Sequence, residues 1–197
     1  MNIPEVGDAA PKRGSKVTKK VVGWLFQALG WRYEGTLPNV PKLVLVGAPH
    51  TSNWDFFLAM GVMFSLDIHM SWLAKHTFVN GPFGSILRRL GGIPVDRTAA
   101  HGLVEQIVQE YKRREHLFLA ISPEGTRSKV RRWRTGFYYI AMGANVPILP
   151  VVADYGRKVI ALCEPIWPSG NIEEDMARLQ ANFSGVFGKR RRFEVGA

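Results

Sequence analysis

Residues 47–57, GAPHTSNWDFF, contain two side chains whose types and spacing could do chemistry, His50 and Asp55. An aspartate that accepts a hydrogen bond from one imidazole nitrogen fixes the histidine tautomer and leaves the other nitrogen as a base. Ser52 and Asp55 also fit a capping box, in which a hydroxyl caps a helix and an acid three positions later returns the bond. The local pattern therefore allows either a catalytic pair or the start of a helix.

The spacing of this pair restricts where a helix can begin. Five residues at about 100° each turn through about 500°, so a regular helix would set the two side chains roughly 140° apart. His50 must then lie in the loop before the helix if it is to touch Asp55. Pro49 and the polar side chains of residues 51–53 favour a helix start at this point.

Apolar runs and turn residues predict the elements that must position the pair. We predict strands at residues 43–47, 71–75, 92–95, 116–122, 146–153 and 158–166, and helices at residues 55–70, 82–90, 99–114, 136–144 and 171–187. This alternation predicts an α/β fold, a single domain whose largely parallel central sheet is flanked by helices. Trp54, Phe56 and Phe57 are expected in the core, although a tunnel for an apolar substrate chain would need such side chains too.

Three polar loops follow strands of the predicted sheet. His50 follows one strand, Arg97 follows another, and the turn SPEGTR at residues 122–127 follows a third. Ligands of open α/β sheets bind outside the carboxyl ends of the strands, so parallel strands would bring the three loops to one rim. Arginines at that rim suit a phosphate-bearing substrate, and Gly125 would let the backbone approach it closely.

The candidate base has no protein nucleophile to activate. The chain lacks a G-x-S-x-G elbow, and its one cysteine, Cys163, lies in the apolar run VIALCEP, which predicts a buried thiol. A His–Asp pair alone suits deprotonation of a substrate hydroxyl or of water. The other histidines lack metal-ligand spacing, so we expect no metal site. They are His69, His76, His101 and His116.

Four stretches resemble the motifs of the glycerol-3-phosphate and 1-acylglycerol-3-phosphate O-acyltransferases. PHTSNWD at residues 49–55 is similar to their H-x4-D motif, and GGIPVDR at residues 91–97 to their second block. SPEGTRS at residues 122–128 is very close to their P-E-G-T-R-S block, and VPILPV at residues 146–151 resembles their fourth. All four occur in the expected order, which makes the resemblance strong.

The resemblance implies acyl transfer from acyl-CoA or an acyl carrier protein to 1-acyl-sn-glycerol-3-phosphate or a related lysolipid, without cofactor or metal. The product would be phosphatidic acid or a related phospholipid. His50 would be the general base and Asp55 its orienting partner. The implied substrate contacts are Arg97, Glu124, Gly125, Thr126 and Arg127, with Ile148 and Pro150 on the acyl-binding side.

The basic and apolar residues at the N-terminal end of the chain suggest contact with a membrane. We expect residues 1–20 to form a mobile basic arm. Residues 21–31, VVGWLFQALGW, predict either a segment lying in a lipid interface or a first helix docked on the core. We therefore divide the chain into an N-terminal segment, 1–35, and an acyltransferase domain, 36–197. No apolar stretch is long enough to span a bilayer and no signal peptide is evident, so we expect a peripheral protein at the cytoplasmic face.

The formal net charge of +10 favours an anionic partner, such as an anionic membrane surface, a phosphorylated substrate or nucleic acid. A nucleic-acid-binding module has only this charge in its favour and gives His50 and Asp55 no role, so we expect no nucleic acid. A thioesterase would use the same pair on water. The arginines at the rim favour transfer to a phosphorylated acceptor instead.

Overall fold

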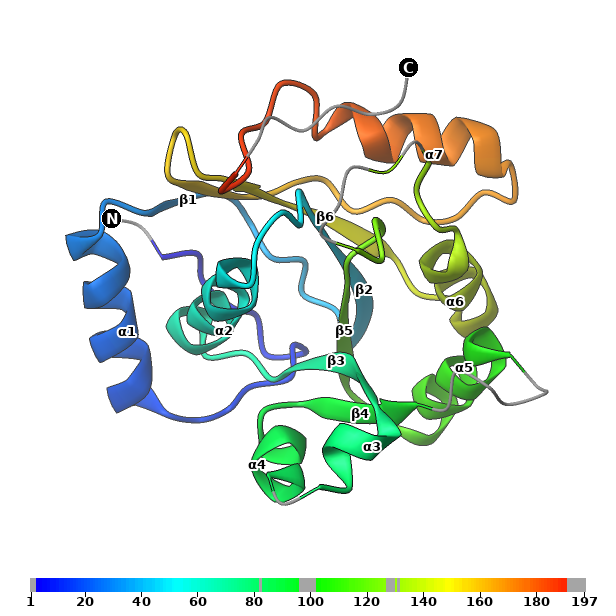
Figure 1. The fold of residues 1–197 in the computed structure, drawn as a ribbon, viewed down its shortest axis with the longest axis horizontal. Coiled ribbons are helices and arrows are strands. Elements are labelled where there is room, and N and C mark those ends of the chain that lie inside the picture. The colour runs from blue at the N-terminus through cyan, green and yellow to red at the C-terminus, as the bar shows by residue number, and fades with distance from the viewer. Residues whose placement is uncertain (1–2, 82, 96–101, 127–129, 131, 191–197) are drawn as a thin grey trace.

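The buried apolar runs of the chain form the strands of one sheet (Figure 1). The computed structural model describes residues 3–81, 83–95, 102–126, 130 and 132–190. In these ranges the strands are β1 (Arg32–Gly35), β2 (Lys42–Ala48), β3 (Met70–Lys75), β4 (Gly92–Val95), β5 (Leu117–Ile121), β6 (Ile148–Asp154) and β7 (Val159–Leu162). The sheet order is β1-β7-β6-β2-β5-β3-β4. Neighbouring strands are parallel except for β6 and β7, which confirms the predicted α/β fold with a largely parallel sheet.

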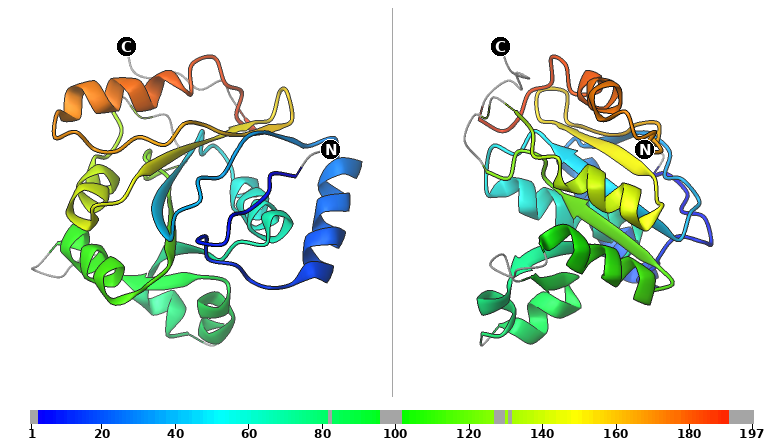
Figure 2. Two further views of the ribbon diagram at one scale, coloured as in Figure 1. Left: turned by 180° about the vertical axis from the view of Figure 1, so that it is seen from behind. Right: turned by 90° about the vertical axis from the view of Figure 1, so that its right-hand side faces the viewer.

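Helices cover both faces of the sheet (Figures 1 and 2). On one face lie α1 (Lys16–Ala28) and α2 (Trp54–Leu66), and on the other lie α5 (Leu103–Arg113), α6 (Gly136–Ala144) and α7 (Ile172–Ala181). The short helices α3 (His76–Val79) and α4 (Gly84–Arg89) contact β4. Each face of the sheet has its own hydrophobic core, and strand β2 contributes side chains to both. Val44 and Val46 pack toward α5 and α6, while Leu43 and Leu45 pack toward α2.

The predicted strands and helices in the described ranges are all present, with differences at their ends. The helix predicted at residues 55–70 ends at Leu66, because Asp67 takes a left-handed backbone conformation with φ of 59°. The helix predicted at residues 171–187 ends at Ala181. Strand β1 and helix α3 were not predicted. Each has only four residues, and Tyr33 is the one buried side chain of β1, so neither leaves a clear pattern.

The N-terminal arm packs on the domain, so the prediction that residues 1–20 are mobile is wrong for the described part. Ala10 is buried, the Arg13 N–H donates to the Asp67 carbonyl, and the His69 N–H donates to the Pro11 carbonyl. Helix α1 begins at Lys16, and the sheet begins with β1, before residue 36. None of the helices in the described ranges has both the length and the apolar character to cross a membrane.

Helix α1 is docked on α2 through Phe26, which is 7% exposed. Gly61 of α2 provides the space, since a Cβ there would lie 2.3 Å from the Phe26 ring. The docked arrangement, one of the two alternatives for residues 21–31, is therefore confirmed. The helix also keeps apolar side chains in solvent on another face, including Val21 and Trp24.

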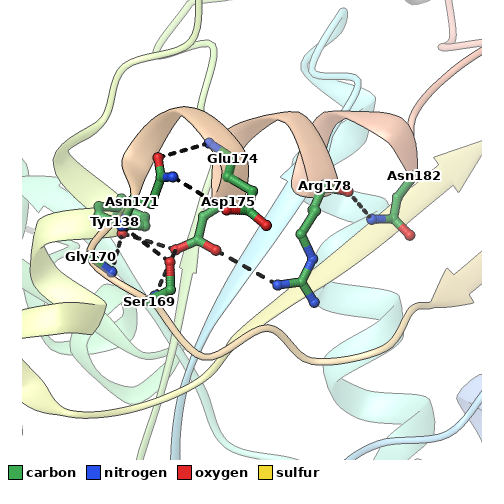
Figure 3. A network of polar contacts seen from close by, with 8 residues as sticks. All are labelled: Tyr138, Ser169, Gly170, Asn171, Glu174, Asp175, Arg178 and Asn182. Carbon is green, nitrogen blue, oxygen red and sulfur yellow. Dashed lines mark hydrogen bonds and ion pairs between the residues drawn. The ribbon is translucent and has the colours of Figure 1, made fainter.

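A buried carboxylate fixes the start of α7 against α6 (Figure 3). Asp175 is 1% exposed, and its Oδ2 accepts hydrogen bonds from the Ser169 N–H at 2.7 Å and the Ser169 hydroxyl at 3.0 Å. The Tyr138 hydroxyl of α6 donates to the same oxygen at 3.0 Å and accepts the Gly170 N–H at 3.1 Å. Burial acts to raise the pKa of Asp175, but these hydrogen bonds and Arg178 hold it below its ordinary value of 3.8.

We expect Asp175→Ala to lower the free energy of unfolding by about 1–3 kcal/mol at neutral pH, because it leaves buried donors without their acceptor. The folded-state pKa lies below that of the unfolded chain. The carboxylate therefore stabilises the fold above its ordinary pKa of 3.8, and this contribution is lost as the pH falls through the lower folded value. Denaturant unfolding of both proteins across this range should show their difference shrinking toward acid pH. The exposed neighbour Glu173→Ala serves as control, and a difference independent of pH would contradict the prediction.

Candidate active site

His50 lies in the loop between β2 and α2, as its spacing from Asp55 requires. Its Nδ1 is 3.3 Å from Asp55 Oδ2, and Asp55 is the second residue of α2. The imidazole is 31% exposed, while the carboxylate is only 9% exposed. An Nδ1–H donated to the carboxylate leaves Nε2 as the nitrogen that can accept a proton. The structure thus brings the two side chains together; their catalytic role stays a prediction.

The Asp55 carboxylate also caps the helix that carries it. Its Oδ2 accepts the backbone N–H groups of Thr51 and Ser52, both at 2.7 Å, and its Oδ1 accepts the Tyr155 hydroxyl at 2.7 Å. Burial acts to raise the pKa of Asp55. The hydrogen bonds from His50, Tyr155, Ser52 and Thr51 outweigh burial and lower the pKa below its ordinary value. The carboxylate is therefore charged at neutral pH, and the same side chain caps the helix and faces the His50 imidazole.

Glu124 supports the His50 loop from the neighbouring strand. Strands β2 and β5 are parallel, and their register places Val46 beside Ile121, so the loops that follow them meet. Glu124 is 3% exposed, and its Oε1 accepts the His50 N–H at 2.6 Å. The resemblance implied a substrate contact for Glu124. The structure places its carboxylate against the backbone of the candidate base, where it fixes the loop.

Gly125 and Thr126 lie beside this support, at the polar end of a cavity. Gly125 has φ of 63°, a conformation that glycine adopts without strain. A Cβ on it would lie 2.7 Å from Arg134 Nε, so the Arg134 side chain crosses directly over this turn. Two arginines expected at the site, Arg97 and Arg127, lie outside the described residues.

The cavity has a volume of about 840 Å³ and extends from the His–Asp pair between α2 and the sheet. At its polar end are His50, Asp55 and Arg134. Its walls are mostly apolar, and they include Leu66 of α2 and Leu162 of β7. Further apolar side chains come from α5 and α6, on the opposite face of the sheet, so the cavity also reaches that face. A cavity of this shape has room for a long apolar chain next to the imidazole of His50.

The strand β6 faces the cavity with different residues from those predicted. Ile148 and Pro150 were expected on the acyl-binding side, but both are buried and neither is among the described residues that line the cavity. Ile148 packs in the core shared with α5 and α6. Val151 and Ala153 line the cavity in their place, because successive side chains of a strand point to opposite faces.

Other predictions about single side chains had mixed outcomes. Trp54, Phe56 and Phe57 are all exposed at the start of α2, so their assignment to the core is wrong; Phe56 also lines the cavity. Cys163 is half-buried, and burial raises the pKa of its thiol, which leaves it mainly protonated.

Tyr155 and Arg134 were missed as site residues, although both carried a signal. Tyr155 follows β6, which is parallel to β2, and the register places Val152 beside Ala48. The strand-end rule that gathered the other three loops therefore applied to Tyr155 as well. Arg134 lies in the basic run after SPEGTR, where one arginine cannot be told from the next by sequence alone.

The fold and the site together define an α/β enzyme with an apolar substrate cavity. The chain belongs to the acyltransferase family, because the family model described as Acyltransferase matches residues 30–154, more than half of its length. It is accordingly an O-acyltransferase.

Named relatives agree with this assignment. The 1-acyl-sn-glycerol-3-phosphate acyltransferase of Haemophilus influenzae is 26% identical over 191 residues, covering 85% of this chain and 78% of that protein. The protein of the same name from Escherichia coli is 32% identical over 111 residues, covering 53% of this chain and 44% of its own length. The crystal structure of the 1-acyl-sn-glycerophosphate acyltransferase PlsC from Thermotoga maritima matches 88% of this chain and 81% of its own, with a TM-score of 0.59 and 21% identity. At 21% identity, this last match shows a similarity of fold alone.

Proposed function

We propose that the protein transfers a fatty acyl group from an acyl thioester, acyl-CoA or acyl carrier protein, to the hydroxyl of 1-acyl-sn-glycerol-3-phosphate or a related lysolipid. The product is phosphatidic acid or a related phospholipid, which places the reaction in phospholipid biosynthesis. The observation that carries the proposal is a His–Asp pair at the mouth of a cavity of about 840 Å³ with apolar walls. The names of the relatives from Haemophilus influenzae and Escherichia coli support the choice of acceptor.

In this reaction His50 acts as the general base. Its Nε2 takes the proton of the acceptor hydroxyl while that oxygen attacks the carbonyl carbon of the thioester. The tetrahedral intermediate collapses, the C–S bond breaks, and the departing thiolate takes the proton back from the imidazolium. Asp55 keeps Nδ1 protonated and stabilises the transient positive charge on the ring. No covalent acyl-enzyme forms in this scheme.

The first prediction concerns His50. We expect thiol release from a long-chain acyl-CoA or acyl carrier protein thioester to require 1-acylglycerol-3-phosphate, and to fall by a factor of at least ~10² in His50→Ala, because the general base is lost. Thiol release is followed with each donor, with and without acceptor.

The matched control for this experiment is His116→Ala. His116 is exposed and precedes β5, so it lies at the opposite end of that strand from the site. The His116→Ala variant should therefore retain full activity. Release that does not need the acceptor would identify an acyl-thioester hydrolase. An unaffected His50→Ala enzyme would contradict the role of His50 as base.

The second prediction concerns the phosphate of the acceptor, for which we propose Arg134 as a ligand, together with the Gly125–Thr126 turn and with Arg97 and Arg127. Arg134 lines the cavity. Its backbone N–H donates to the Pro123 carbonyl at 2.8 Å, which fixes the residue beside that turn. Arg134→Ala should raise the KM for the phosphorylated acceptor about tenfold or more, since a hydrogen bond to a charged group contributes about 1.5–3 kcal/mol.

Two comparisons make the Arg134 experiment specific. Arg132 is exposed two residues earlier and is not among the described residues that line the cavity, so Arg132→Ala should leave the KM for the acceptor unchanged. The KM for the thioester should also stay constant in Arg134→Ala. If instead only the KM for acyl-CoA rises, Arg134 binds the donor and the assignment is wrong.

We further propose that the protein works on the cytoplasmic face of an anionic membrane, with α1 of the N-terminal segment 1–35 facing the membrane, and with residues 36–197 together with β1 (Arg32–Gly35) forming the acyltransferase domain. Val17, Val21 and Trp24 of α1 are spaced by four and three residues and therefore form one stripe. They are 75%, 53% and 65% exposed. Exposed lysines at residues 16 and 20 lie on the same helix, as in segments that place apolar side chains among lipids and lysines near anionic headgroups.

The third prediction tests this surface. Trp24→Ser should weaken binding to phosphatidylcholine vesicles containing phosphatidylglycerol about tenfold, because burial of a large apolar side chain contributes about 1.5–3 kcal/mol. Co-sedimentation of the protein with the vesicles measures the partition. Trp167, which is also exposed but precedes α7, provides the control Trp167→Ser. Equal losses in the two variants, or no binding of the natural protein, would contradict the proposed membrane surface.

A further inference from the structure

The Tyr155 hydroxyl completes the hydrogen bonding of Asp55 from a distant part of the chain. It donates to Oδ1 at 2.7 Å across a sequence separation of 100 residues. The other oxygen, Oδ2, accepts the Thr51 and Ser52 N–H groups and lies beside His50 Nδ1. Burial and the neighbouring carboxylate both raise the pKa of Tyr155, so the phenol keeps its proton and remains a donor at any working pH.

This hydrogen bond restricts the rotation of the Asp55 carboxylate about its bond to Cβ. That rotation determines how Oδ2 faces the imidazole of His50. Rotation about the bond to an aspartate carboxylate has broad, roughly two-fold preferences, so the side chain alone does not fix the carboxylate plane. The Thr51 and Ser52 N–H groups hold only Oδ2. A donor on Oδ1 determines the plane, and with it the direction in which Oδ2 faces the imidazole.

Tyr155 is held in turn by contacts with residues from two other segments of the chain. The Trp31 ring meets it edge-on, with centroids 5.1 Å apart and planes at 85°. Lys189 Nζ lies 5.7 Å from the ring centroid, and the Tyr155 N–H donates to the Phe187 carbonyl at 2.8 Å. The position of the phenol is therefore set by segments that contain none of the family-like motifs.

Trp31 links this arrangement to the C-terminal end of α1. Its N–H donates to the Phe26 carbonyl at 2.9 Å, and the two rings have centroids 6.3 Å apart. Lys158, in the β6–β7 turn that begins at Tyr155, donates from Nζ to the Leu29 carbonyl at 2.9 Å. The end of α1 and the turn that carries Tyr155 are thus joined by direct bonds.

We propose that Tyr155 is a positioning residue for acyl transfer, which orients Asp55 for His50 and is itself held by Trp31 at the end of α1. The proposal rests on the proposed roles of His50 and Asp55 as the catalytic pair. It assigns to the docked N-terminal helix a contribution to the geometry of the site, in addition to any contact with lipid.

The decisive variant is Tyr155→Phe, which keeps the ring and its contact with Trp31 and removes only the hydroxyl. We expect kcat to fall about tenfold, because one hydrogen bond to a charged group is lost, while the KM values for donor and acceptor stay constant. Tyr139→Phe, an exposed tyrosine on α6, is the matched control and should behave as the natural protein. Thermal unfolding of each variant establishes that it is folded.

A second pair of variants tests the link to α1. Trp31→Leu should lower kcat, and Trp31→Phe should restore most of it, because an aromatic edge again faces Tyr155. In the Tyr155→Phe background Trp31→Leu should have little further effect, since the hydroxyl that it positions is already absent. Fully additive losses in kcat would overturn the link between Trp31 and Tyr155.

The outcomes separate this inference from the proposed function. If His50→Ala abolishes transfer but Tyr155→Phe keeps the natural kcat, the acyltransferase mechanism stands and the positioning role is wrong. A rise in KM with unchanged kcat would make Tyr155 a substrate contact instead, and would also overturn the inference. If His50→Ala has no effect, the proposed catalytic pair itself fails.

Discussion

The structure of the site depends on one buried carboxylate that must remain charged. Asp55 is only 9% exposed, and an ionised carboxylate in such a place is costly unless hydrogen bonds replace its water. Two backbone N–H groups, a phenol and an imidazole supply those bonds. The N-terminal end of α2 adds the favourable side of the helix dipole. The requirements of a stable carboxylate and of an oriented histidine are therefore met by the same atoms, and the helix cap is a condition of the proposed chemistry.

The parallel sheet brings these partners together from three strands. β2 leads into His50, its neighbour β5 leads into Glu124, and its other neighbour β6 leads into Tyr155. Because these strands are parallel, all three loops leave the sheet at the same edge. The second buried carboxylate, Glu124, then holds the backbone of His50 while Asp55 holds its ring. The backbone of the candidate base is thus held from the loop after β5, and its side chain from helix α2.

Sequence reasoning predicted the part of this arrangement that depends on local pattern. The strand positions, the loop placement of His50 and the meeting of the β2 and β5 loops followed from periodicity and the strand-end rule. Features that depend on tertiary packing could not be predicted from local pattern. The face of β6 that lines the cavity depends on where its neighbours lie, which is why Ile148 and Pro150 were chosen in place of Val151 and Ala153. The exposure of Trp54 likewise has no signature in a run of apolar residues.

Helix α2 connects the site to the cavity, and this connection constrains how a substrate can lie. Asp55 stands in its first turn, while Leu58, Val62 and Leu66 line the cavity at intervals of four residues farther along. An acyl chain bound as proposed along this row would lie beside the helix whose first turn carries Asp55, the partner of His50. A shift of α2 would displace the carboxylate and this wall of the cavity together. The docking of Phe26 of α1 against Gly61 of α2 therefore stabilises both the site and the cavity.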